Sequence, residues 1–367
     1  MKRRALDIVI LGLSLSSSWG NGHATTFRAL MRGLHGLGHR LTFLERNVPW
    51  YAGHRDLAEP EFCDLVFYDA VEELDGIHGP RLRAADVVIV GSFVPDGVAV
   101  IDRVAALCAG NLCFYDIDTP VTLAKLAGGD RDYLAPRQIR LFDIYFSFTG
   151  GPSLCRLETE FGARRARPLY CSVDEDRYRP TGEAPAWDLG YMGTYSPDRQ
   201  PSLERLLLET ARRMPERSFV VAGSQFPADI AWPDNVERID HLPPSGHASF
   251  YSRQRFTLNL TRSDMIAAGW SPSVRLFEAG ACGCPVISDP WPGLDMFFKP
   301  GEALHVAQST NDVCAILSGS DEAVRIDMAR RARQLVLDTH TGTALARDLL
   351  RSLAETGAPD SGIRAAL

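Results

Sequence analysis

The segment Arg262–Asp289 combines residue types and spacings that suit the binding of a nucleotide: RSDMIAAGWSPSVRLFEAGACGCPVISD. Ser271 followed by Pro272 predicts that a helix begins here, because serine can cap a first turn and proline suits its first position. The next amides, those of Ser273 and Val274, then have no partner within the helix. They could donate hydrogen bonds to an anion, which the helix dipole also attracts.

Glu278 is a candidate ligand for the ribose of such a nucleotide. It lies five residues after Ser273, which is about 7.5 Å along a helix. With a diphosphate at the helix start, this carboxylate could accept hydrogen bonds from ribose hydroxyls. Val274 and Arg275 fall on the same helix face. The neighbours of Glu278 in the sequence are apolar, so a buried carboxylate would need a partner. The alternative is a capped surface helix with a solvated glutamate.

A possible counter-charge for the diphosphate is Arg262. It follows the strand predicted over Phe256–Leu260 and precedes the helix just described. Its planar guanidinium matches the geometry of phosphate oxygens. The alternative is a solvated arginine in a loop.

The first half of the chain offers three candidates for proton transfer. Asp116 and Asp118 follow the strand predicted over Asn111–Tyr115, and His23 stands at the start of a predicted helix. A carboxylate at such a strand end could act as a general base that takes a proton from a hydroxyl, and Asp118 is the first choice for this role, ahead of Asp116. His23 could act as acid or base. The alternatives are turn formation by the aspartates and polar capping by the histidine.

Two further patterns are weaker. Asp116-x-Asp118 is formally a D-x-D pattern, but we do not interpret it as a metal site, and no other His, Cys, Asp or Glu set has convincing metal-ligand spacing. We therefore predict no metal. The loop with Glu45, Arg46, Trp50 and Tyr51 places aromatic side chains beside charges. It could bind a sugar or another stacked ligand, and a packed loop is the alternative.

Short apolar runs alternate with helical stretches in the first half, which predicts a doubly wound parallel sheet. The run Asp86–Gly91 is apolar at successive positions, as expected of a strand buried on both faces. Apolar residues at i, i+3 and i+4 predict a helix over Ala24–Leu37. Further strands are predicted over Asp7–Leu13, Arg40–Leu44, Asn111–Tyr115 and Asp143–Phe148.

The character of the sequence changes over Arg167–Pro180, which is polar, charged and contains prolines, as a linker does. The alternation then resumes. We therefore expect two α/β domains over 1–172 and 173–345, with a closing helix and tail over 346–367. Strands in the second domain are predicted over Leu189–Met192, Ser218–Ala222, Phe256–Leu260 and Pro285–Ser288, and helices over Ser202–Met214, Ser273–Cys282, Glu322–Leu337 and Thr343–Ala354.

Composition excludes several classes of protein. The 367 residues are 45% hydrophobic, enough for two packed cores. A net charge of −7 argues against a nucleic-acid partner. The eight cysteines include no C-x-x-C pair, which predicts free thiols and a cytoplasmic location. No apolar run reaches the roughly 18 residues of a membrane span. The basic N-terminus could start a signal peptide, but Asp7 interrupts the apolar run, which favours a strand.

The C-terminal half contains the stretch PSVRLFEAGACGCPVISD, followed by WPGLDMFF and PGEAL. These stretches resemble the C-terminal signature of GT-B glycosyltransferases, and most closely that of the CgeB-type spore-maturation group, which is family 4-like. The segments CSVDEDRYRP and HTGTALARDLL are similar to the linker and closing helix of the same superfamily. The resemblance implies an α/β fold of two Rossmann-like domains facing across a cleft. It also implies that Glu278 binds the ribose of a nucleotide-sugar donor.

The resemblance implies roles for further residues. The first turn of the C-terminal domain, within Leu189–Leu207, would face the donor phosphates, and the loop after Ser218–Ala222 would lie near the base. Retaining relatives often carry a glutamate eight positions before the ribose ligand, where this sequence has Trp270. This leaves the stereochemistry of transfer open. The donor-site candidates here are Gly193, Tyr195, Ser196, Arg199 and Gln225.

The predicted function is transfer of a sugar from a nucleotide diphosphate sugar to an unknown acceptor hydroxyl, with the donor as substrate and no cofactor. The alternatives are a nucleotide-sugar epimerase on the same fold and a non-catalytic nucleotide or sugar-binding protein. A nicotinamide-dependent oxidoreductase is disfavoured because the loop after the first strand lacks the pattern G-x-G-x-x-G. Gly20 and Gly22 match its first two glycines, but Thr25 stands at the third.

Overall fold

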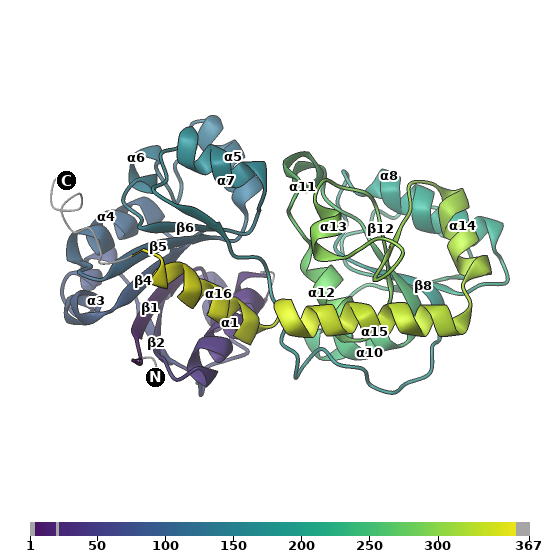
Figure 1. Cartoon of the computed structure of the whole chain (residues 1–367), viewed down its shortest axis with the longest axis horizontal. Helices are drawn as coiled ribbons and strands as arrows, with labels where there is room; N and C mark the ends of the chain where they lie inside the picture. Colours follow the sequence, from purple (N-terminus) through teal and green to yellow (C-terminus); the bar gives the residue numbers. More distant parts are fainter. Residues whose placement is uncertain (1–3, 20–21, 357–367) are drawn as a thin grey trace. The chain divides into compact units, whose positions relative to one another are not determined.

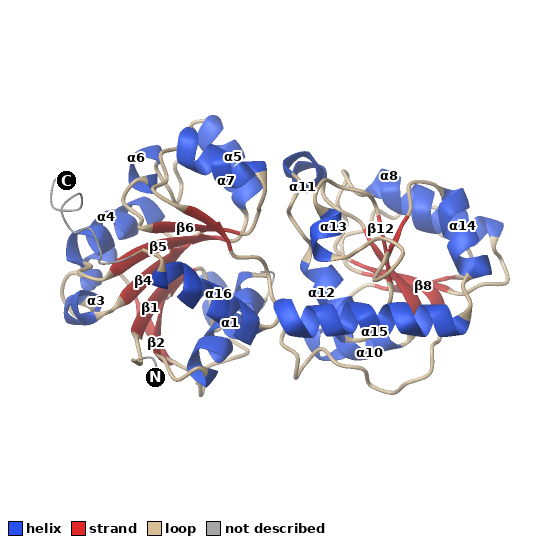
Figure 2. Ribbon diagram, viewed as in Figure 1, coloured by secondary structure: helices blue, strands red, loops and turns tan. Residues whose placement is uncertain are grey.

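The computed structural model describes residues 4–19 and 22–356. The chain folds into two compact units, which are shown in Figures 1 and 2. Unit 1 comprises Met1–Ser172 and Thr341–Leu367, and unit 2 comprises Val173–His340. The predicted α/β architecture of two doubly wound domains is confirmed.

Unit 1 is built on a seven-stranded sheet in the order β3-β2-β1-β4-β5-β6-β7, in which each paired strand is parallel to its neighbour. Its strands are β1 (Asp7–Gly12), β2 (Arg40–Arg46), β3 (Asp64–Tyr68), β4 (Val87–Gly91), β5 (Asn111–Asp116), β6 (Ile144–Ser147) and β7 (Ala166–Pro168). Its helices are α1 (His23–Gly36), α2 (Pro49–Ala52), the 3-10 helix Val71–Leu74, α3 (Gly79–Ala84), α4 (Gly97–Leu107), α5 (Thr119–Ala127), α6 (Pro136–Ile139), α7 (Pro152–Thr159) and α16 (Gly342–Ala354).

Unit 2 repeats the pattern with a six-stranded parallel sheet in the order β10-β9-β8-β11-β12-β13. Its strands are β8 (Trp187–Met192), β9 (Phe219–Ala222), β10 (Val236–Ile239), β11 (Gln254–Asn259), β12 (Val286–Ser288) and β13 (His305–Val306). Its helices are α8 (Gln200–Leu203), a π-helical turn over Glu204–Leu208, α9 (Glu209–Arg213), the 3-10 helix Pro244–Gly246, α10 (His247–Ser252), α11 (Ser263–Ala268), α12 (Val274–Ala281), α13 (Leu294–Phe297), α14 (Thr310–Gly319) and α15 (Glu322–Thr339).

Each sheet is buried on both faces because its central strands are apolar at successive positions. In β1, Val9 and Leu11 join the core that contains Val100 of α4. On the opposite face of the sheet, Phe27 of α1 packs on Phe43 of β2, with ring centroids 5.4 Å apart. Helices therefore cover both faces of the sheet, as Figure 2 shows for each unit.

The last helix of the chain belongs to unit 1. The sequence placed the first domain boundary after residue 172 and the second after 345, whereas the structure divides the chain after Ser172 and after His340. The helix α16 packs along α1. The two backbones meet so closely that a Cβ added at Gly342 would overlap the carbonyl oxygen of Ala29. The closing helix is therefore part of the first Rossmann-like domain.

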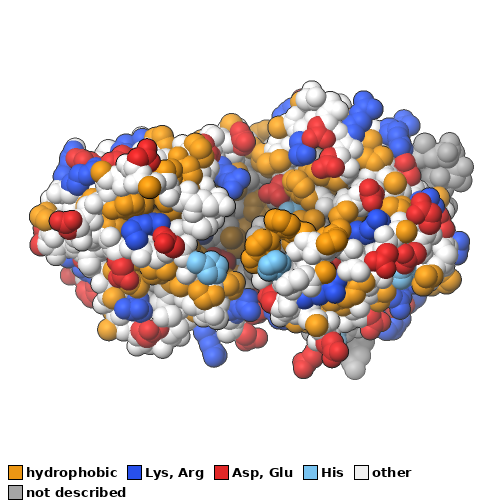
Figure 3. Space-filling model, turned by 180° about the vertical axis from the view of Figure 1, so that it is seen from behind, with side chains coloured by type: hydrophobic (Ala, Val, Ile, Leu, Met, Phe, Trp, Pro, Cys, Tyr) orange, Lys and Arg blue, Asp and Glu red, His pale blue; other side chains and the backbone are white. Residues whose placement is uncertain are grey.

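The surface carries both signs of charge. On the face shown in Figure 3, lysine and arginine side chains are intermingled with aspartate and glutamate. All eight cysteines are free. Within residues 4–19 and 22–356, no helix is both long enough and apolar enough to cross a membrane.

Candidate functional site

The main candidate site of unit 2 lies where the strand order changes direction. The chain runs from β8 outward through β9 to β10, then returns to the other side of β8 to form β11. In open parallel sheets, ligands bind at the carboxyl ends of the strands at such a switch point. A cavity of about 190 Å³ lies there, lined by Thr194, Arg199, Leu260, Thr261, Arg262, Met265, Ser273 and Arg275.

Three arginines line this cavity, and Arg199 is the most unusual of them. Only 5% of Arg199 is exposed. Its Nη2 donates to the carbonyl oxygen of Thr194 at 2.8 Å, but its buried Nε has no hydrogen-bond partner in the described structure. Burial lowers the pKa of Arg199, and the positive charges of Arg275 and Arg262 lower it further. Like charges gathered in this way favour an anion between them, because only an anion offsets their repulsion and desolvation.

The starts of three short helices position the arginines. Arg199 and Arg262 precede the first residues of α8 and α11, and Arg275 is the second residue of α12. The prediction that Ser271 caps α12 is wrong. Ser273 is the cap, because its extended backbone lets its Oγ accept from the amide of Arg275 at 3.4 Å. The same Oγ lies 3.2 Å from Nη1 of Arg275, so the cap also fixes the guanidinium.

The new position of the cap changes which amides are available. The amide of Arg275 is satisfied by Ser273 Oγ, and that of Leu276 by the carbonyl oxygen of Ser273 at 3.1 Å. In the described part of the chain the amide of Val274 has no such partner, and it remains available to an anion.

The other predicted donor-site residues surround the cavity without lining it. A Cβ added at Gly193 would lie 2.6 Å from the hydroxyl oxygen of Tyr191 and 3.0 Å from Nη2 of Arg275, so two side chains approach this glycine closely. Tyr195 donates its amide to the carbonyl oxygen of Ser224 at 3.0 Å. Ser196 donates its hydroxyl to Asp198. Gln225 is exposed and has a left-handed backbone, with φ of 67°.

Glu278 lies on α12, three residues after Arg275, and it is buried. Its Oε2 accepts a hydrogen bond from the hydroxyl of Tyr251 at 3.1 Å. Burial, and then the negative charge of Glu278, raise the pKa values of Tyr251 and Tyr178 well above the ordinary value. The apolar sequence around Glu278 predicted that a buried carboxylate here would need a partner, and Tyr251 is such a partner.

The sequence interpretation missed Arg275 and Tyr251 as site residues. Arg275 had a detectable signal, because a cation in the first turn of a helix that binds an anion is a plausible ligand. Tyr251 had none, since it lies on α10 and reaches Glu278 only through the tertiary fold.

In unit 1 the structure brings His23 and Asp118 together. His23 opens α1 and Asp118 precedes α5, and His23 Nε2 lies 2.9 Å from Asp118 Oδ2. An ionised carboxylate can only accept, so Nε2 carries the hydrogen. The two side chains differ in access: the imidazole is buried, whereas 45% of the Asp118 side chain is exposed. Asp118 is therefore the member that can meet a second molecule.

Asp116 lies beneath this pair and does not reach the surface. Its carboxylate accepts from the hydroxyls of Tyr145 at 2.6 Å and Thr122 at 2.7 Å. Burial raises the pKa of Asp116 to about 6. Its Oδ1 also accepts from the amide of Asp118 at 3.3 Å. The position of Asp116 is thus suited to holding the Asp118 backbone.

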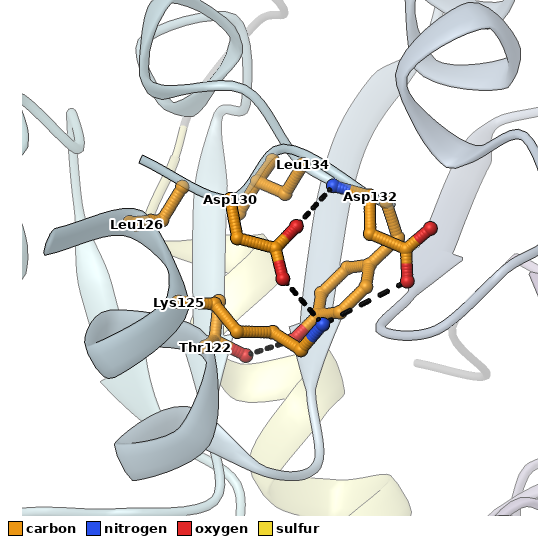
Figure 4. A pocket seen from close by; sticks show the side chains of 7 residues that line it. Thr122, Lys125, Leu126, Asp130, Asp132 and Leu134 are labelled. Atoms are coloured by element: carbon orange, nitrogen blue, oxygen red, sulfur yellow. Dashed lines mark hydrogen bonds and ion pairs between the residues drawn. The ribbon is translucent and has the colours of Figure 1, made fainter. Parts of the chain in front are cut away.

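A small cavity borders this network. Its volume is about 10 Å³, room for about one water molecule. Thr122 forms one wall, and Lys125 reaches toward two carboxylates at the other, with Nζ 2.7 Å from Asp130 and 3.7 Å from Asp132 (Figure 4). This cavity lies between the second half of α5 and the segment that follows it, and it is too small for a substrate. In the described residues, no three His, Cys, Asp and Glu side chains are grouped so that they could hold a metal ion.

Comparisons with known proteins agree with this architecture. Residues 199–351 match a family model described as Glycosyl transferase-like. No curated protein matches the chain in sequence. Sucrose-phosphate synthase from Thermosynechococcus elongatus has a similar structure, with a TM-score of 0.68 and 13% identity over 96% of this chain and 99% of that chain.

Two further solved structures are similar. Anabaena HepE in complex with UDP and glucose gives a TM-score of 0.66 at 11% identity, over 95% of this chain and 100% of that chain. An α-glucosyltransferase in complex with UDP-glucose and DNA gives 0.69 at 13% identity, over 96% of this chain and 100% of that chain. These comparisons show that the chain has the GT-B fold and that residues 199–351 resemble a glycosyl transferase-like family.

Proposed function

We propose that the protein is a glycosyltransferase that uses a nucleoside diphosphate sugar as donor and holds the diphosphate at Arg199, Arg262 and Arg275. The observation that supports this most directly is the buried, incompletely paired Arg199 in a cavity with two other arginines. HepE has been solved with UDP and with UDP-glucose. A uridine diphosphate sugar is therefore the first donor to test.

In this proposal the arginines also stabilise the leaving group. As the bond between C1 of the sugar and the diphosphate oxygen breaks, negative charge grows on the diphosphate. The fixed guanidinium groups of Arg199 and Arg275 compensate that charge where it develops. Arg262 adds a third positive charge from the start of α11. We propose that these side chains supply the compensation without a metal ion.

The rest of the nucleotide lies along α12 in the proposal. The amide of Val274 and the hydroxyls of Tyr195 and Ser273 donate to phosphate oxygens near Gly193. The Ser196 hydroxyl joins them when it exchanges its hydrogen bond to Asp198 for one to a phosphate oxygen. The Glu278 carboxylate keeps lone pairs beyond the one that accepts from Tyr251, and these accept the ribose hydroxyls. Gln225 is the residue assigned to the base.

We propose Asp118 as the base, with His23 and Asp116 as positioning residues. Asp118 accepts the proton from the acceptor hydroxyl while the acceptor oxygen bonds to C1 and the diphosphate leaves. His23 Nε2 fixes one carboxylate oxygen, so the exposed oxygen faces the acceptor. Direct displacement inverts the configuration at C1. Trp270 at the position of the glutamate in retaining relatives supports inversion, because it offers no second carboxylate.

Two finer assignments are also part of this proposal. The stretch that includes Glu278 supports membership of the CgeB-type group. The eight free cysteines support a reducing, cytoplasmic location.

The test measures binding and turnover with UDP and UDP-glucose. Calorimetry should detect UDP, and the protein should release UDP slowly from UDP-glucose by transfer to water. An Asp118→Asn variant should bind UDP with unchanged affinity. It should form UDP from UDP-glucose at least tenfold more slowly, since general base catalysis contributes about 10²–10⁴-fold. Binding of NAD but of no nucleoside diphosphate would contradict the proposal. Binding of UDP without any turnover would favour a non-catalytic binding protein.

A further inference from the structure

Unit 1 exposes two tryptophans that lie side by side. Trp19 is 45% exposed and Trp50 is 64% exposed. Their ring centroids are 5.0 Å apart and the rings are inclined by 57°. His54 stacks on Trp19 at 4.1 Å, nearly parallel to it. Large aromatic rings that are left in water as a group mark an interaction site more often than a packing element.

The aromatic group lies at the same edge of the sheet as the proposed base. Trp19 follows β1, and Trp50 lies in α2 just after β2, the strand that pairs with β1. Asp118 follows β5 and is hydrogen-bonded to His23, which comes four residues after Trp19 in the sequence. All these strands are parallel, so all these residues come from the carboxyl edge of one sheet.

The backbone beneath Trp19 is fixed by a buried carboxylate. Glu45, at the end of β2, is fully buried. Its Oε2 accepts from the amides of Leu15 and Ser16 at 2.6 and 2.9 Å, and its Oε1 accepts from the hydroxyls of Ser14 and Ser16 at 3.1 and 2.6 Å. A carboxylate with four donors has no lone pair to spare for another role. The segment Ser14–Ser16, which leads to Trp19, is therefore held to β2 before any ligand arrives.

The loop is also tied to the segment that carries His54. Ser17 Oγ donates to the carbonyl oxygen of His54 at 2.8 Å. Both the amide and the hydroxyl of Ser18 donate to the Asp56 carboxylate, at 2.9 and 2.8 Å. Arg28 clamps the same carboxylate at 2.9 and 2.8 Å. The aromatic side chains thus stand on a preorganised frame, which lowers the entropy lost on binding.

From these observations we propose that Trp19, Trp50 and His54 form the acceptor subsite, and that the acceptor is a saccharide. This inference rests on the proposed transferase function and names its acceptor class. A pyranose ring presents C–H bonds on its faces and hydroxyls at its edge. The inclined indoles pack against a ring face, while the edge hydroxyls stay in contact with water.

The local charge favours a saccharide over a lipid surface. The segment after His54 contains one arginine, Arg55, and two exposed, unclamped carboxylates, Glu59 and Glu61, besides Asp56, which Arg28 pairs. Anionic membranes attract tryptophans that are accompanied by lysine and arginine, and they repel an acidic border. The carboxylates of Glu59 and Glu61 are suitable acceptors for sugar hydroxyls.

The experiment measures saccharide binding without any donor. Maltotriose, cellotriose and triacetylchitotriose are each titrated against the full chain, with saturation-transfer NMR and tryptophan emission as readouts. At least one should bind, and Trp50→Ala and Trp19→Ala should each weaken it by about tenfold, the size expected for loss of one stacked ring. Trp50→Phe should recover most of the affinity. Ile77→Ala, which removes an exposed apolar side chain elsewhere in unit 1, should have no effect.

Two results would overturn the inference. One is that none of the three saccharides binds, or that binding persists in the Trp19→Ala, Trp50→Ala double variant. The other is a tryptophan-dependent association with vesicles of phosphatidylcholine and phosphatidylglycerol in place of saccharide binding. UDP affinity is measured in parallel on every variant and should stay within twofold. If the unmodified protein does not bind UDP at all, the proposed donor site is wrong. Failure of the donor site and failure of the acceptor inference are therefore distinguishable.

Discussion

Replacing Arg199 by methionine should weaken nucleotide binding without weakening the fold. Arg199 is buried beside two other arginines, and the carbonyl oxygen of Thr194 is its hydrogen-bond partner. Methionine fills most of the same volume and removes an uncompensated charge. Replacing buried charges by apolar side chains is often neutral or stabilising. We therefore expect the free energy of unfolding without ligand to stay within about 1 kcal/mol or to rise.

The loss in binding is larger. A hydrogen bond to a charged group contributes about 1.5–3 kcal/mol, so the Kd for UDP should rise about 10- to 150-fold. At a UDP concentration of 100 times the original Kd, the unmodified protein gains about 2.7 kcal/mol, and a variant with a 100-fold weaker Kd gains about 0.4 kcal/mol. For a unit of this size these gains correspond to Tm increases of about 5–11 °C and about 1–2 °C.

Calorimetry and thermal melts with and without UDP give both quantities. Arg255→Met is the matched control, because Arg255 is paired with Asp188 and Glu322 on the same unit. It should lower stability and leave the Kd unchanged. If Arg199→Met instead lowers stability and keeps the UDP affinity, the guanidinium is a structural group and the reasoning fails.

Three other substitutions test separate parts of the structure. Glu278→Gln should raise the Kd for UDP more than tenfold but leave that for inorganic diphosphate within twofold, and equal losses for both would argue against a ribose contact. His23→Gln should lower kcat by about 10-fold or more and leave the Kd for UDP unchanged, because the positioned proton acceptor contributes 10²–10⁴-fold; an unchanged kcat in steady-state assays would remove His23 from the mechanism. Gly342→Ala should destabilise the protein by about 1–3 kcal/mol in urea unfolding, since the added methyl overlaps Ala29; an unchanged midpoint would show that the two helices can separate without cost.

The central strands could be predicted from the sequence, and the edge strands could not. All nine strands inside the two sheets were predicted within a few residues, because burial makes most of their positions apolar. The four missed strands, β3, β7, β10 and β13, are the outermost ones. An edge strand has one neighbouring strand and is more exposed to solvent. The strand β10 has the sequence Val-Glu-Arg-Ile, which is not a continuous apolar run. Its place in the sheet is decided by pairing with β9.

The site shows the same division. The helix start near Ser273 and the buried Glu278 were predicted because their signals are local. The π-helical turn over Glu204–Leu208 interrupts the helix predicted over Ser202–Met214, and nothing in its leucines predicts it. The pairing of His23 with Asp118 joins positions 95 residues apart. Such contacts are set by the order of the strands, which the sequence pattern left open.

The packing of α16 against α1 affects the order in which the protein can be completed during synthesis. Unit 2 ends at His340, whose carbonyl oxygen accepts from the amide of Val173, so the chain enters and leaves this unit at adjacent points. Unit 1 starts first on the ribosome, yet the face of α1 that meets Gly342 stays uncovered until the final helix emerges. A premature stop after His340 would therefore leave the later-made half whole and damage the half that was translated first.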